Sequence, residues 1–164
     1  MKKVMIPGSF DPVTRGHMSV VRAAAEMFDE VYVVILANGE KPGGMFTRDE
    51  RLTLLRAAVN ELKHDGITGV YAETFDGLTT DAARKFGCEI LVKSARNSAD
   101  FEYEASLAEI TRKFEPSLKT VLIPALPEEA HISSTYIRER IKYGRFDGDD
   151  FAPGTVELIR EMRG

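Results

Sequence analysis

Short apolar runs alternate along the chain with longer segments of helical periodicity. The apolar runs are rich in β-branched residues and cover 2–6, 30–37, 69–74, 89–93 and 119–124. The segments of helical period cover about 15–28, 47–63, 79–86, 101–115, 133–142 and 153–163. Nearly continuous apolar strands separated by helices indicate a parallel sheet that is buried on both faces.

This alternation predicts an α/β fold, in which right-handed crossovers wind helices onto both faces of a five-stranded parallel sheet. Thr47 and Glu50 fit a capping box at the start of one helix. The apolar residues after it recur at helical spacing and should face the sheet: Leu52, Leu55, Val59 and Leu62. No repeat, low-complexity tract or linker divides the chain, so residues 1–164 are expected to form one domain.

Composition narrows the class of protein without changing this fold. Hydrophobic residues make up 43% and charged residues 29%, as in ordinary globular proteins, and the net charge is −4. A mildly acidic chain lacks the basic surface that nucleic acid binding needs, so nucleic acid is not expected as a partner. Cys88 is the single cysteine and is expected to be small buried filler; it excludes an intrachain disulfide. With no apolar segment of signal-peptide or membrane length, we expect a soluble, cytoplasmic protein with no membrane partner.

Candidate chemistry lies where the apolar runs end, the place where open α/β sheets bind ligands. The first run is followed by "GSFDPVTRGH", in which Gly8 and Gly16 would let an anion approach the backbone at a helix start. His17 offers two ring nitrogens as donors, and Ser9 offers a hydroxyl. The segment is neither a P-loop nor a dinucleotide fingerprint. The simpler interpretation is a turn with a capping histidine.

Cations and hydroxyls follow the other runs. Lys41 lies in a Gly-rich loop, and Lys93 and Arg96 are three residues apart, although solvated surface positions would explain them equally well. Ser133, Ser134 and Thr135 precede the fifth helix and could form a second phosphate cradle or simply cap it. Arg138 could swing back toward them. His64 and His131 are expected on the surface. Because these cations, hydroxyls and helix starts converge at one edge of the predicted sheet, the sequence predicts a site for a polyphosphate. The His and Cys residues are scattered along the chain and do not make a zinc site.

Two motifs resemble those of a known superfamily. Thr14-Arg15-Gly16-His17 matches the (H/T)xGH signature of the nucleotidyltransferases, and "ISSTYIR" at 132–138 matches their ISSTxxR signature. "GSFDPVT", "FDGLTTDAAR" and "ADFEYE" are similar to bacterial phosphopantetheine adenylyltransferases over nearly the whole chain. The resemblance implies a Rossmann-like fold and transfer of the adenylyl group of ATP to 4′-phosphopantetheine, with dephospho-coenzyme A and pyrophosphate as products.

The resemblance also implies roles for residues and partners. His17, Lys41 and Ser9 are the implied catalytic residues, and Ser9, Lys41, Thr79 and Lys93 are the implied acceptor contacts. The implied ATP contacts are Ser9, Phe10, His17, Ser94, Ala95, Arg96, Glu104, Glu129, Ala130, His131, Ile132, Ser133, Ser134 and Thr135. Mg²⁺ is expected to offset the phosphate charge without a metal site made by the protein alone, and the implied assembly is a homo-hexamer.

The acceptor side departs from the family pattern. Lys93-Ser94-Ala95-Arg96 stands where the family reads Arg-Gly-Leu-Arg, Thr79 occupies an apolar position, and Thr111 replaces a common asparagine. A lysine keeps the charge of arginine but loses its bidentate fork. Alternatives are therefore a relative that adenylylates another phosphorylated small molecule, a cytidylyltransferase or nicotinamide-mononucleotide-type enzyme, or a non-enzymatic flavodoxin-like or receiver module.

Overall fold

A five-stranded parallel sheet forms the centre of the computed structural model, which describes residues 1–37 and 44–164. Its strands are β1 (Lys3–Gly8), β2 (Glu30–Leu36), β3 (Val70–Phe75), β4 (Ile90–Ala95) and β5 (Lys119–Pro124). They lie in the order β3-β2-β1-β4-β5, and every neighbouring pair is parallel. The predicted doubly wound sheet is confirmed, and each strand lies within a residue or two of its predicted range.

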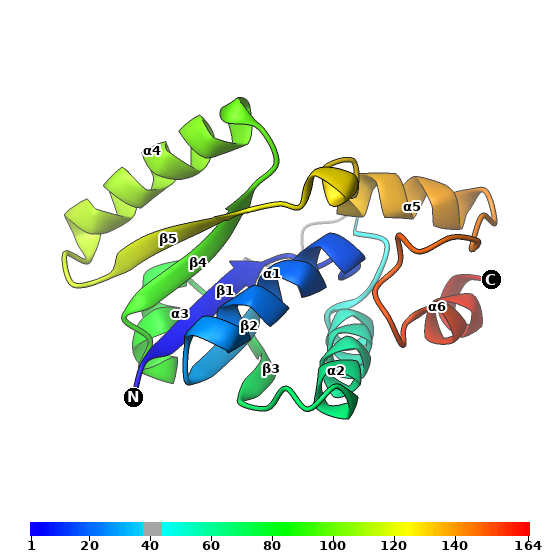
Figure 1. Ribbon diagram of the computed structural model, residues 1–164, viewed down its shortest axis with the longest axis horizontal. Helices are drawn as coiled ribbons and strands as arrows, with labels where there is room; N and C mark the ends of the chain where they lie inside the picture. The colour runs from blue at the N-terminus through cyan, green and yellow to red at the C-terminus, as the bar shows by residue number, and fades with distance from the viewer. Residues whose placement is uncertain (38–43) are drawn as a thin grey trace.

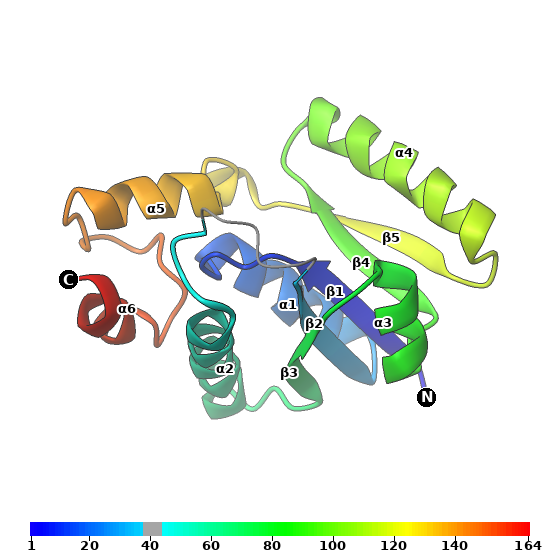
Figure 2. The same ribbon diagram turned by 180° about the vertical axis from the view of Figure 1, so that it is seen from behind.

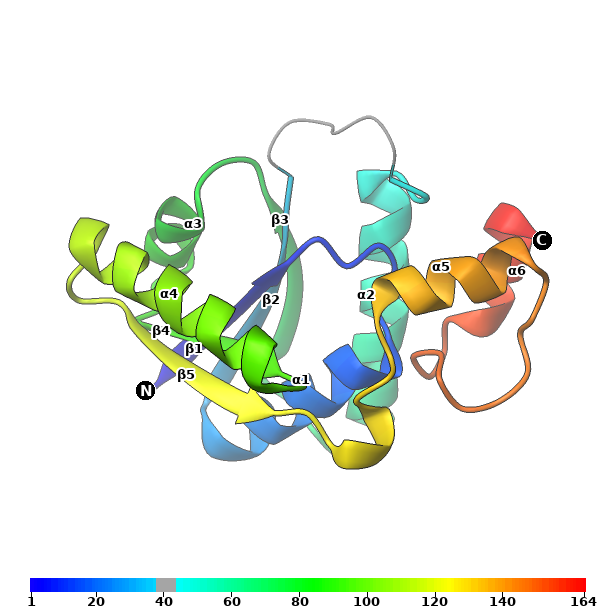
Figure 3. The same ribbon diagram turned by 90° about the horizontal axis from the view of Figure 1, so that it is seen from above.

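Helices cover both faces of this sheet. They are α1 (Arg15–Met27), α2 (Arg48–His64), α3 (Thr79–Phe86), α4 (Ser98–Phe114), α5 (Ser134–Lys142) and α6 (Val156–Arg163), with a short 3₁₀ helix η1 (Pro127–Glu129) before α5. Figures 1 and 2 show α1 and α3 on opposite faces and α4 along the β4–β5 edge. The helices α5 and α6 lie together beyond the carboxyl ends of the strands (Figure 3).

Two apolar clusters hold the helices to the sheet. On one face Val31, Val33 and Ile35 belong to the larger cluster, with buried residues of α1, α2, α5 and α6. On the other face Met5 and Leu91 pack in a smaller cluster with Ala82 and Ala83 of α3 and with Cys88. Alternate residues of one strand thus enter different clusters, as expected for a sheet that is buried on both sides.

The α2 prediction is confirmed residue by residue. Thr47 and Glu50 form the predicted capping box, in which the Thr47 hydroxyl accepts from the Glu50 N–H and the Glu50 carboxylate accepts from the Thr47 N–H. Leu55, Val59 and Leu62 are buried, and Leu52 is partly buried against the same cluster. Cys88 is also buried, as expected, and burial raises the pKa of its thiol to about 11.

Two helix starts differ from the predicted ones for local reasons. Helix α4 begins at Ser98 rather than 101, because the Asn97 side chain caps it by accepting from the Asp100 N–H at 2.9 Å. Helix α6 begins at Val156 rather than 153, because Pro153 and Gly154 form a turn in which Gly154 has φ +82°. No helix within residues 1–37 and 44–164 is both long and apolar enough to cross a membrane.

Candidate active site

A cleft of about 400 Å³ opens at the carboxyl ends of β1 and β4, between α1, α4 and the start of α5. It therefore lies at the switch point where strand order reverses, the position that open α/β sheets use for ligands. Its lining residues are Ile6, Pro7, Gly8, Phe10, Thr14, Gly16, His17, Val20, Val92, Lys93, Ser94, Arg96, Asp100, Tyr103, Glu104, Ala125, Glu129, Ile132, Ser133 and Ser134.

His17 is fixed by the first turn of α1. The N-cap residue Thr14 accepts from the His17 backbone N–H, and the Thr14 N–H donates to His17 Nδ1 at 2.9 Å. Histidine thus takes the place that glutamate or glutamine usually has in a capping box. Because Nδ1 is the acceptor of an N–H, the ring proton of neutral His17 must lie on Nε2.

The electrostatics of the cleft keep this imidazole uncharged. Burial, together with the nearby charge of Arg96, lowers the pKa of His17 from 6.5 to about 4. At neutral pH His17 therefore presents one N–H donor, Nε2, to the cleft. The expectation that both ring nitrogens donate is wrong in this respect, because the helix cap occupies Nδ1.

The loop before α1 packs against the His17 ring. Phe10 is buried and meets His17 edge-on, with ring centroids 4.9 Å apart. Its φ of +46° is uncommon for a residue with a side chain and turns the ring back over Gly8. A Cβ at Gly8 would lie 2.9 Å from the Phe10 ring, so glycine is needed there for close packing of the loop as well as for room in the cleft.

Two cations of the cleft are paired with carboxylates of α4. Lys93 Nζ lies 3.3 Å from Glu104 Oε2, and Arg96 Nε donates to Asp100 Oδ2 at 2.9 Å. The hydrogen bonds from the Arg96 side chain and backbone lower the pKa of Asp100. Glu104 Oε2 is buried, and the Lys93 ammonium group is its charged partner.

The start of α5 forms the opposite side of the cleft. Ser133 caps the helix by accepting from the Tyr136 N–H, while the Ser134 hydroxyl donates to the Pro12 carbonyl at 2.9 Å. The Ser133 O–H and the first helical N–H groups, which have no intrahelical acceptors, are therefore the donors available to an anion. Thr135 does not line the cleft; its hydroxyl accepts from Arg138.

Arg138 does not swing back toward the cleft in this structure. Its guanidinium donates to the Asp11 carbonyl at 2.8 Å and lies 3.8 Å from the Asp11 carboxylate. The residue thus fastens α5 to the loop between β1 and α1.

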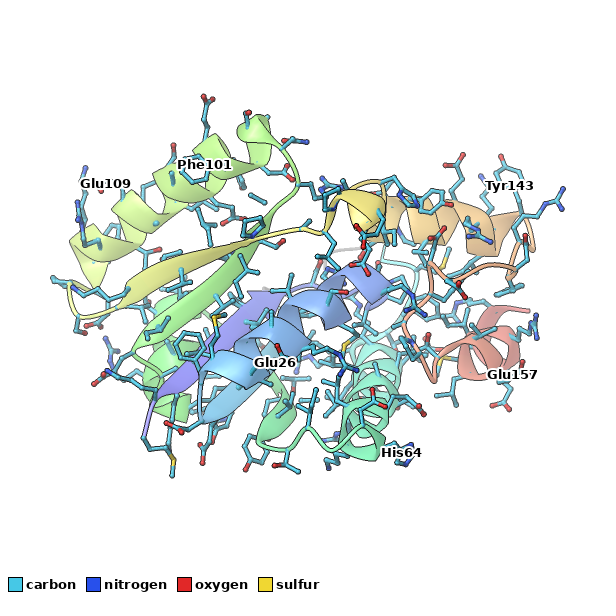
Figure 4. All side chains as sticks on the ribbon, viewed as in Figure 1. Glu26, His64, Phe101, Glu109, Tyr143 and Glu157 are labelled. Carbon is cyan, nitrogen blue, oxygen red and sulfur yellow. The ribbon has the colours of Figure 1, made fainter. Side chains whose placement is uncertain are left out.

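The structure brings most of the predicted site residues together. Ten of them line the cleft: Phe10, His17, Lys93, Ser94, Arg96, Glu104, Glu129, Ile132, Ser133 and Ser134. The others that are described lie outside its lining: Ser9, Thr79, Ala95, Ala130, His131 and Thr135. Lys41 lies outside the described residues. His64 and His131 are exposed, as predicted, with His64 at the periphery at the end of α2 (Figure 4).

Two acidic residues near the cleft, Asp100 and Asp11, are not among the site residues predicted from the sequence. Asp100 orients Arg96 by accepting from its backbone N–H and its side chain. The predicted residue Glu129 accepts from the Ser19 hydroxyl at 2.9 Å. Asp11 is buried in the loop between β1 and α1, where its carboxylate accepts from the N–H groups of Met45 and Phe46. An acid between Phe10 and Pro12, directly after a buried strand, is the sequence signal for Asp11.

Known proteins share both the sequence and the fold of this chain. Residues 5–140 match the family described as cytidylyltransferase-like. Phosphopantetheine adenylyltransferase of Symbiobacterium thermophilum is 40% identical over 98% of this chain and 96% of its own length. The enzyme of the same name from Corynebacterium diphtheriae is 37% identical over 98% of both chains. The chain belongs to the phosphopantetheine adenylyltransferase family.

Membership of the phosphopantetheine adenylyltransferase family excludes a non-enzymatic receiver or flavodoxin-like module. A crystal structure of a putative nicotinate-nucleotide adenylyltransferase from Vibrio parahaemolyticus superposes with a TM-score of 0.65 at 21% identity, covering 98% of this chain and 99% of that one. At that identity the similarity establishes the fold alone, which is the predicted nucleotidyltransferase fold.

Proposed function

We propose that this protein transfers the adenylyl group of ATP to 4′-phosphopantetheine, giving dephospho-coenzyme A and pyrophosphate. The observation that carries the proposal is the meeting of both signature helix starts, α1 with His17 and α5 with Ser133, at one cleft in a chain of this family. Positive helix ends and N–H donors on two sides of a cleft suit a triphosphate laid between them.

The reaction needs charge stabilisation more than proton transfer. The acceptor phosphate is already an anion at neutral pH and attacks the α-phosphorus, from which pyrophosphate leaves. In our assignment the neutral His17 donates from Nε2 to an α-phosphate oxygen as negative charge accumulates there. Arg96 and the start of α5 hold the β- and γ-phosphates, while Lys93 and the predicted contact Lys41 receive the acceptor phosphate.

Divalent metal fits this site as part of the nucleotide. No cluster of three or more His, Cys, Asp or Glu side chains in the described ranges could hold a metal ion. The acids of the cleft are instead paired with Lys93 and Arg96 or bonded to Ser19. Mg²⁺ is commonly held by substrate phosphates and water. We propose that Arg96 and Ser133 hold phosphate oxygens of ATP and that Mg²⁺ bound to the nucleotide would offset the remaining triphosphate charge.

A pyrophosphate-release assay tests the activity. ATP and CTP are each combined with Mg²⁺ and a panel of phosphorylated acceptors, including 4′-phosphopantetheine and nicotinamide mononucleotide. We expect release only with ATP and 4′-phosphopantetheine, and mass spectrometry should identify dephospho-coenzyme A. Preference for another acceptor would assign Lys93-Ser94-Ala95 to a different substrate, and preference for CTP would contradict the proposed donor.

A cytoplasmic location stays a prediction.

We also infer that the chain assembles into a homo-hexamer through α4. This helix has no buried residue, and Phe101, labelled in Figure 4, is 53% exposed. Phe114 at the end of the helix is 80% exposed. Apolar surface of this kind on a soluble protein indicates an interface. Sedimentation should give a mass of about six 18.2 kDa chains, and Phe114→Glu should dissociate it. A monomer at micromolar concentration would contradict the inference.

A further inference from the structure

The segment between α5 and α6 lies against the start of α1 and against α5, the two helices that carry the signatures. After α5 the chain turns back toward the start of α1 before it enters α6 (Figures 1 and 2). Phe151 forms an isolated antiparallel bridge with Thr14, and the Arg15 N–H donates to the Asp150 carbonyl at 3.3 Å. The backbone of Asp150 is thereby bound to the first turn of α1, the turn that holds His17.

The side chain of the same residue binds the other signature. The Asp150 carboxylate accepts from the Tyr136 hydroxyl at 2.8 Å and from Arg140 Nη1 at 3.0 Å, both on α5. Its other oxygen lies 3.4 Å from Nε2 of His131, just before the ISST residues. Burial alone would raise the pKa of Asp150, but the Tyr136 hydrogen bond and the charges of His131 and Arg140 outweigh it and lower that pKa.

We propose that Asp150 is a positioning residue that sets the separation between the two helix starts and thereby the affinity of the protein for ATP. The proposal rests on the proposed function of the cleft. A single residue binds α1 through its backbone, and through its carboxylate it binds Tyr136 of the ISSTYIR segment and the residues His131 and Arg140 that flank this segment. Donors at two helix starts can bind one triphosphate only if their separation matches the spacing of its phosphates, so loosening either start weakens nucleotide binding.

Kinetics of Asp150→Ala test the proposal. The KM for ATP should rise about tenfold, because the variant loses the charge-assisted hydrogen bonds of the Asp150 carboxylate and we expect this loss to weaken ATP binding by about one order of magnitude. The KM for the acceptor and kcat should change by less than about threefold, because the acceptor contacts remain and the Thr14–His17 cap that orients the His17 ring does not involve the Asp150 side chain. Asp150→Asn, which keeps an acceptor for Tyr136, should recover part of the affinity. Asp147→Ala is the matched control, since Asp147 shares Arg140 but is 86% exposed and contacts neither signature.

A measurement without nucleotide separates this proposal from the proposed function. Amide hydrogen exchange should accelerate in residues 13–18 and 131–137 of Asp150→Ala and stay unchanged in Asp147→Ala. If the wild-type protein is inactive but the two variants show this exchange pattern, the proposed function is overturned and the positioning role of Asp150 is not. An unchanged KM for ATP would overturn the positioning role of Asp150. Equal changes in the two KM values and in kcat would overturn it as well. Should Asp150→Ala not fold, Tyr136→Phe must still raise the KM for ATP about threefold.

Discussion

Replacing His17 by alanine should lower kcat by about 10²–10³ while the dissociation constant for ATP changes only a few-fold. The reason is that Nε2 is expected to donate most strongly to the α-phosphate oxygen when negative charge accumulates there. Helix starts and Arg96 still bind the ground-state triphosphate in this variant. Steady-state kinetics and ATP titration by calorimetry measure the two quantities separately. Near-normal turnover would remove His17 from the mechanism.

Two amide variants identify which ring nitrogen matters. Glutamine places an N–H near the position of Nε2, whereas asparagine reaches only as far as Nδ1 and can keep the acceptor for the Thr14 N–H. We expect His17→Gln to retain about tenfold more turnover than His17→Ala. His17→Asn should resemble alanine in turnover. The reverse order would mean that Nδ1 faces the phosphate and that the helix cap opens during the reaction.

The pH dependence of folding provides an independent check on the neutral imidazole. Since the pKa of His17 is about 4 in the native protein against 6.5 in the unfolded chain, the unfolded state binds more protons between these values. Stability from this residue is therefore complete above about pH 6.5 and is lost as the pH falls toward 4. Urea unfolding of wild type and His17→Asn over this range should show a smaller loss in the variant.

The fold was predictable because its determinants are local. Apolar runs such as 30–37 are separated by helical segments, and the Thr47–Glu50 box marks the start of α2 before any long-range contact is known. The same locality underlies the His17 cap, which the sequence analysis gives as the simpler interpretation of this loop. Thr14 and His17 have capping-box spacing with histidine in the third position, so the occupied Nδ1 could have been inferred from four consecutive residues.

The partners of the charged residues were not predictable in the same way. Lys93 meets Glu104, eleven positions away, only because α4 runs back along the strand that it follows. The sequence places Arg138 where it could swing back toward phosphate, yet in the structure it binds Asp11, which lies 127 positions away. Sequence spacing limits how far a side chain can reach, but it does not determine which of several opposite charges the tertiary fold brings within that reach.

Asp11→Ala should lower the free energy of unfolding by about 3–5 kcal/mol, the usual cost of removing one partner from a buried charged network. Asp11 is 7% exposed, and its carboxylate accepts from the N–H groups of Met45 and Phe46 at 3.0 and 2.9 Å. It also lies 3.5 Å from Arg51. Alanine leaves the N–H groups of Met45 and Phe46, the second of them fully buried, and the Arg51 guanidinium without this acceptor. Urea unfolding of the ligand-free protein measures the loss.

Matched variants distinguish this network from ordinary surface charge. Asp11→Asn keeps one acceptor oxygen but no charge, so its loss should be smaller, about 1–3 kcal/mol. Asp76→Ala removes a 67% exposed carboxylate 3.7 Å from Arg48 and should change stability by less than about 0.5 kcal/mol. Equal small effects for Asp11 and Asp76 would contradict the network. If Asp11 acts through the fold, kcat of the folded Asp11→Asn fraction should stay within a few-fold of wild type, unlike that of His17→Ala.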